Sequence, residues 1–105
     1  MDRNYLDLLR CLNAAKVKYL VIGGYAVIYY SEPRYTKDLD IWIEASSQNA
    51  RRTLRALRRF GAPIDNLTEE DLAKPGLIYV FGLPPLRVDI INRASGRSFA
   101  AAWKS

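Results

Sequence analysis

Two aspartates, Asp38 and Asp40, lie in the apolar segment Asp-Leu-Asp-Ile-Trp-Ile, residues 38–43. β-Branched and aromatic residues with a period of two predict a strand. Residues two apart on a strand share a face, so the two carboxylates lie together, roughly 7 Å apart along the backbone. Close like charges repel unless a cation lies between them, and Mg²⁺ favours carboxylate oxygens. The pair therefore indicates a divalent-cation site; the alternative is a solvated strand face.

A third carboxylate, Asp89, lies in a second apolar segment, residues 86–91, and shares a face with Arg87. The short link 82–85 joins this segment to another predicted strand, Leu77–Phe81, which indicates an antiparallel hairpin. We therefore expect Asp89 in the same sheet as the other two aspartates. Two metal ions held roughly 4 Å apart by shared carboxylates can activate an attacking oxygen and stabilise a leaving one. Asp89 is accordingly a candidate third metal ligand.

A glycine pair, Gly23-Gly24, separates an apolar strand, residues 18–22, from a predicted short helix, residues 25–30. Because the strand is apolar on both faces, we expect it at the centre of the sheet. A strand that ends in glycines and opens a helix presents free backbone N–H groups, and glycine lets a phosphate approach closely. The pair is therefore a candidate phosphate site, although Gly-Gly alone is also an ordinary tight turn.

Two cations, Arg34 and Lys37, precede the carboxylate strand. One interpretation is local charge compensation of the aspartates. The other is contact with a triphosphate, for which the guanidinium group is geometrically suited. The sequence leaves both interpretations open.

Taken together, Gly23-Gly24, a 13-residue spacer, Asp38-x-Asp40 and the later Asp89 resemble the polymerase-β-like nucleotidyltransferase superfamily. The similarity is greatest to the minimal nucleotidyltransferases, including the MNT-like and AbiEii-like proteins of bacterial toxin–antitoxin systems. It covers most of the chain, from about Val17 to Ile91. It implies an α/β (α+β) nucleotidyltransferase fold with a small mixed sheet of about four strands flanked by helices.

The resemblance also implies a reaction, the Mg²⁺- or Mn²⁺-dependent transfer of NMP from an NTP to an acceptor hydroxyl, with release of pyrophosphate. Asp38, Asp40 and Asp89 would be its catalytic residues and metal ligands, with Asp89 alternatively the base. The acceptor would be an RNA, a protein or a small molecule. The family often has a small hydroxyl residue at the position of Thr36. The implied nucleotide-binding residues are Gly23, Gly24, Arg34, Thr36 and Lys37.

The chain departs from the family pattern in two respects. Gly-Gly stands where the family commonly has Gly-Ser, so a serine hydroxyl that contacts the phosphate is missing, as in the AbiEii-like subgroup. Family members usually continue with further helices, whereas here the sequence stops in a helix that begins near Ser98. We therefore expect residues 1–105 to form a single minimal domain, a fragment, or a domain that a partner protein or a homodimer completes.

The composition is that of one globular domain, with 105 residues, 50% of them hydrophobic and 26% charged. The absence of histidine excludes histidine acid–base chemistry and histidine–zinc sites. The single cysteine, Cys11, excludes an intrachain disulfide and fits a cytoplasmic location. The longest apolar run is too short to span a bilayer, and we expect no membrane association.

A helix over residues 2–16 and a second over 48–60, with an N-cap at Ser46-Ser47, complete the expected framework. The net charge of +5 suits a polyanionic partner. A solvated basic face on the second helix is favoured over a nucleic-acid footprint, because no aromatic residues interleave with its arginines. A non-catalytic, antitoxin-like partner protein and a nucleic-acid-binding module remain the alternative functions. The arginines are Arg51, Arg52, Arg55, Arg58 and Arg59.

Overall fold

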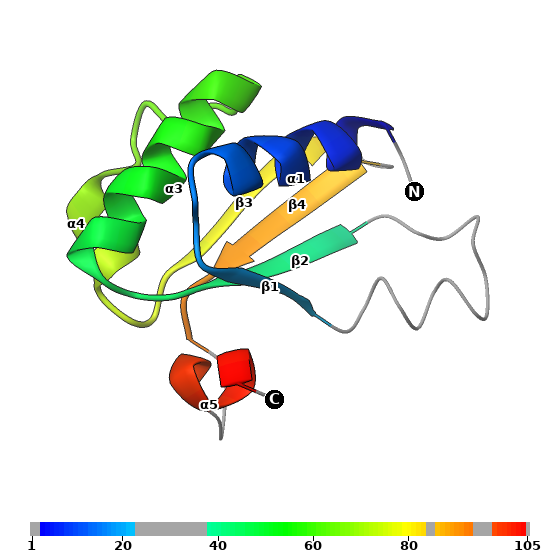
Figure 1. Cartoon of the computed structure of the whole chain (residues 1–105). Coiled ribbons are helices and arrows are strands. Elements are labelled where there is room, and N and C mark those ends of the chain that lie inside the picture. Colours follow the sequence, from blue (N-terminus) through cyan, green and yellow to red (C-terminus); the bar gives the residue numbers. More distant parts are fainter. Residues whose placement is uncertain (1–2, 23–37, 84–85, 94–97, 105) are drawn as a thin grey trace.

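The computed structural model describes residues 3–22, 38–83, 86–93 and 98–104 (Figure 1). Within these ranges the chain forms four helices and four strands. The predicted helices and strands in these ranges are confirmed, with ends that differ by one or two residues. The elements are α1 (Arg3–Ala14), β1 (Tyr19–Ile22), β2 (Asp38–Ile43), α3 (Ser47–Phe60), α4 (Glu69–Ala73), β3 (Ile78–Leu83), β4 (Leu86–Ile91) and α5 (Phe99–Lys104).

The described strands form one sheet in the order β1-β2-β4-β3. The two central strands, β2 and β4, are parallel, while β1 and β3 pair with them antiparallel. The mixed sheet, the β3–β4 hairpin and the α/β (α+β) class are therefore confirmed. The expected central position of β1 is wrong, because in this sheet β1 pairs only with β2. Val21 of β1 is 44% exposed, which shows that this apolar strand is only partly covered.

The hydrophobic core lies on one face of the sheet. Leu39, Ile41 and Ile43 of β2 are fully buried, and alternate residues of β4 join them beneath α1 and α3. Figure 1 shows these two helices on the same side of the sheet. The intervening residues of β2 and β4, among them Asp40 and Asp89, belong to the opposite face. The period-two pattern thus separates the core from the candidate site.

The opposite face is partly covered at the carboxyl ends of β2 and β4. The short helix α5 packs there through Phe99, whose ring meets Trp42 edge-on, with ring centroids 5.4 Å apart and an interplanar angle of 88°. Trp42 is only 4% exposed as a result. No helix within the described ranges is long and apolar enough to cross a membrane.

Helix α3 has well-defined signals at both ends. The Ser46 side chain accepts a hydrogen bond from the Asn49 N–H, which confirms an N-cap at Ser46. Gly61 ends the helix in the left-handed conformation, at φ 95°, and its N–H bonds to the Leu57 and Arg58 carbonyls. The buried amide of Asn49 also bonds to both backbone groups of Lys18, and so ties α3 to the start of β1.

Replacing Gly61 by alanine should lower the free energy of unfolding by about 1 kcal/mol, because a Cβ disfavours the left-handed backbone. Nothing lies within 4 Å of the added Cβ, so the effect would come from the backbone alone. Chemical denaturation measures it. Gly61→Asn is the matched control and should lose less, since asparagine tolerates this region. Equal losses in both variants would contradict a conformational origin.

Candidate active site

The parallel pairing of β2 with β4 sets Asp40 directly opposite Asp89. Residues opposite one another in neighbouring strands point to the same face, about 4.8 Å apart at the backbone. The same register sets Asp38 opposite Arg87, one pleat towards the start of both strands. Two carboxylates from segments about half the chain apart are thereby brought together on the face that the core does not use.

Asp89 is held by its neighbour on the same strand. The Arg87 Nε donates to Asp89 Oδ1 at 2.9 Å, and Nη2 donates to Oδ2 at 3.4 Å. The Asp89 side chain is 20% exposed, whereas that of Arg87 is 44% exposed. This two-point contact fixes the plane of the carboxylate and offsets one negative charge of the pair. The sequence placed both residues on one face but gave no prediction of their ion pair.

Asp40 is of intermediate exposure, with its Oδ1 atom withdrawn from solvent. Two carboxylates on neighbouring strands repel one another unless positive charge lies near them. Hard oxygen donors of this kind suit Mg²⁺ or Mn²⁺. Asp89 retains acceptor capacity for a cation while it is bonded to Arg87, because a carboxylate has about four lone-pair sites. The Asp40–Asp89 pair therefore fits a divalent cation.

The described side chains contain no group of three or more acidic or cysteine residues that could hold a metal ion. Asp38 does not enter this comparison, because its backbone is described but its side chain is not. The five predicted nucleotide-binding residues lie outside the described residues, as does the predicted helix 25–30. They are Gly23, Gly24, Arg34, Thr36 and Lys37. The structure thus brings together two of the candidate residues, Asp40 and Asp89.

A cavity of about 380 Å³ lies beyond Trp42, between the ends of the central strands and α5. Phe99, Asn92, Arg93 and Glu44 are among the residues that line it. The indole Nε1 of Trp42 is buried and has no hydrogen-bond acceptor among the described residues. Trp42 follows Asp40 by two positions on the same face of β2, but neither Asp40 nor Asp89 lines this cavity. Sequence reasoning missed it, since α5 is distant along the chain.

Two tyrosines have shifted acidity, and neither belongs to the carboxylate face. Burial raises the pKa of Tyr19, partly offset by a hydrogen bond from its hydroxyl to Asn13. Burial and the nearby charge of Asp65 raise the pKa of Tyr79. Both side chains pack against the core on the helix-covered side. Their ionisation therefore has no direct connection with the Asp40–Asp89 pair.

The comparisons with known proteins add no assignment to this geometry. The chain matches no protein-family model, no curated protein and no solved structure.

Proposed function

We propose that the protein is a metal-dependent nucleotidyltransferase that transfers NMP from an NTP to an acceptor hydroxyl. The observation that carries the proposal is the β2–β4 register, which pairs Asp40 with Asp89 on the solvent side of the sheet. Asp38 precedes Asp40 by two residues on the same strand and would supply a further carboxylate to two shared metal ions. The resemblance of the glycine and aspartate pattern to minimal nucleotidyltransferases supports the same assignment. The proposal includes a cytoplasmic location and a role in a toxin–antitoxin system.

Each residue has a distinct part in this proposal. Asp38, Asp40 and Asp89 would hold Mg²⁺ or Mn²⁺, which when bound supplies charge neutralisation to the triphosphate. Alternatively, Asp89, which Arg87 contacts, would be the base that accepts the proton of the acceptor hydroxyl. Gly23 and Gly24 would bind phosphate through their N–H groups. Arg34, Thr36 and Lys37 would complete the nucleotide site.

Calorimetric titration with ATP, GTP, CTP and UTP, each with Mg²⁺ or Mn²⁺, tests the proposal directly. Binding that requires the metal would support a working nucleotide site and would identify the preferred nucleotide. If none of the four nucleotides binds with either metal, the proposal of an autonomous nucleotidyltransferase is wrong. A non-catalytic protein that acts through a partner would then be the better hypothesis.

A second prediction separates this site from the basic helix. The variant with both Arg51→Ala and Arg55→Ala should bind metal and nucleotide as the wild type does, because α3 covers the core face of the sheet. The affinity from the same titration measures this. Both arginines are exposed, so the fold should be preserved. A large loss of nucleotide affinity would move the nucleotide site from the carboxylates to α3.

A further inference from the structure

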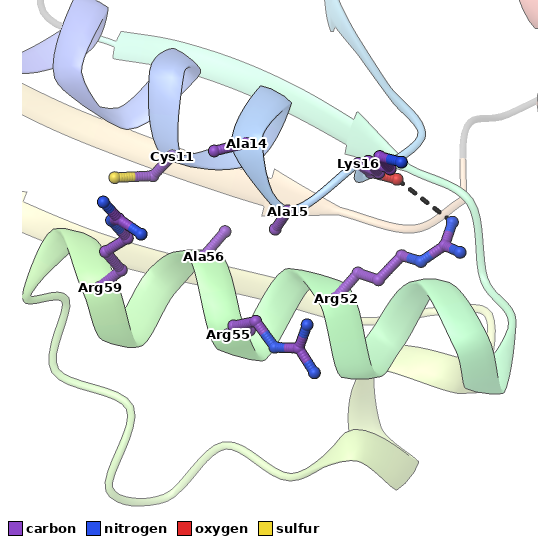
Figure 2. Close-up of a pocket in the computed structure, with 8 residues that line it drawn as sticks. All are labelled: Cys11, Ala14, Ala15, Lys16, Arg52, Arg55, Ala56 and Arg59. Atoms are coloured by element: carbon purple, nitrogen blue, oxygen red, sulfur yellow. Dashed lines mark hydrogen bonds between the residues drawn. The ribbon is translucent and has the colours of Figure 1, made fainter.

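A cavity of about 310 Å³ lies on the other side of the molecule, between α3 and the carboxyl end of α1 (Figure 2). Its apolar lining consists of Cys11 and Ala14 from α1, Ala15 directly after α1, and Ala56 from α3. The remaining lining residues are four cations. None of the lining residues, all of them in the described part of the chain, is acidic. The cations are Lys16, Arg52, Arg55 and Arg59.

These four cations have no ion pair within the described residues, although other cations of the protein do. Arg51, also on α3, pairs with Glu69 at 3.6 Å, and Arg10 of α1 pairs with Asp7 at 3.5 Å. At the rim of the cavity, Arg52 Nη1 donates a hydrogen bond to the Lys16 carbonyl oxygen, at 3.3 Å. Like charges gathered around one hollow favour an anion there.

The spacing of the arginines along α3 indicates the shape of a suitable ligand. Arg52, Arg55 and Arg59 follow one another at i, i+3 and i+7, and therefore share one face of α3. Their backbone positions rise by about 4.5 and about 6 Å along the helix axis. A row of guanidinium groups, each able to bind two phosphate oxygens, suits a ligand with successive phosphates. Figure 2 shows the Arg52 and Arg59 side chains directed toward α1 and its end, and that of Arg55 lying along α3.

We propose that this α1–α3 groove binds the phosphate backbone of a base-paired nucleic acid, independently of sequence. No aromatic residue lines the groove, so unpaired bases would find no stacking surface. The floor consists of alanines and one cysteine, which form no deep apolar pocket for the large anchor residues of a peptide helix. Backbone phosphates need neither feature. The groove is separated from the Asp40–Asp89 pair by the sheet, so the proposal does not depend on nucleotidyl transfer.

Fluorescence anisotropy with a short labelled RNA duplex of arbitrary sequence, measured between about 50 and 200 mM salt, tests this site. Affinity should fall steeply with salt. Arg55→Ala with Arg59→Ala should weaken binding about tenfold and reduce the salt slope by about 2. The control variant, Lys74→Ala with Arg93→Ala, removes the same charge elsewhere and should stay within about twofold of the wild type. All four side chains are exposed, and thermal melting verifies that both variants fold.

Three results would overturn the proposal. They are no duplex binding at low salt, an equal loss in the groove variant and the charge-matched control, and displacement of the duplex by polyglutamate as effectively as by unlabelled duplex. The last would indicate an acidic protein partner. Asp40→Asn should leave duplex binding unchanged, whereas the groove variant should leave metal-dependent nucleotide binding unchanged. Failure of one proposal is therefore distinguishable from failure of the other.

Discussion

Asp40→Asn is expected to weaken metal-dependent nucleotide binding by about 100-fold or more. Even residues that only orient a metal ligand commonly change metal affinity by 10–100-fold, and the loss of a charged ligand should reach at least the upper end of that range. Asparagine keeps the shape and one oxygen of the side chain but removes the charge. Calorimetric titration of the nucleotide that binds best, with Mg²⁺ or Mn²⁺ present, measures the effect.

The same substitution should not destabilise the protein. Asp40 lies opposite Asp89, so removing its charge relieves a repulsion in the metal-free state. The free energy of unfolding without metal should therefore stay the same or rise. Asp65→Asn is the matched control, because it makes the same chemical change in an exposed residue far from the carboxylate face. Metal binding that survives in Asp40→Asn, or that is lost equally in Asp65→Asn, would show that the carboxylate assignment is wrong.

Local sequence patterns predicted the elements and their faces well, because those properties depend on neighbouring residues. The alternation in residues 38–43 separated Leu39 and Ile41 from Asp40, and in the structure Leu39 and Ile41 are buried in the core while Asp40 is of intermediate exposure. Ser46 similarly marked the start of α3. Short segments are enough for such predictions, since capping and strand alternation involve residues only a few positions apart.

The pairing of strands that are distant along the chain was harder to predict from the sequence. The short link between β3 and β4 predicted their hairpin, but nothing local specifies that β4, rather than β3, lies beside β2. The direct opposition of Asp40 and Asp89 follows from that choice and from its register. The edge position of β1 was missed for the same reason, because apolar residues on both faces do not identify the neighbours of a strand.

The basic groove could likewise be predicted only in part, because it is built by residues that are distant along the chain. Its arginines were evident from the sequence as one charged face of a helix. The contribution of Lys16 and Cys11 was not, because it requires α1 to pack beside α3. Because α1 packs beside α3, part of the helix face that the sequence indicated as solvated forms the wall of a cavity.

Asn92→Ala should be the most destabilising of the substitutions considered, lowering the free energy of unfolding by about 3–5 kcal/mol. Asn92 is 4% exposed and follows directly after β4. Its Oδ1 accepts hydrogen bonds from the N–H groups of Gly76 and Leu77, each at 2.8 Å. Its Nδ2 donates to the carbonyls of Leu72 and Lys74, at 2.9 and 2.7 Å. Alanine would leave these backbone groups without their side-chain partner.

The loss should exceed that of an ordinary hydrogen bond, because one side chain joins the end of α4, the turn before β3 and the end of β4. Thermal unfolding should show the midpoint falling by roughly 15 °C or more. Asn66→Ala, which changes an exposed asparagine in the preceding loop, is the control and should fall by no more than a few degrees. If the two variants melt alike, Asn92 does not hold these segments together. A large difference would show that this amide holds the end of α4 and the turn before β3 to the carboxyl end of β4, the strand that bears Asp89.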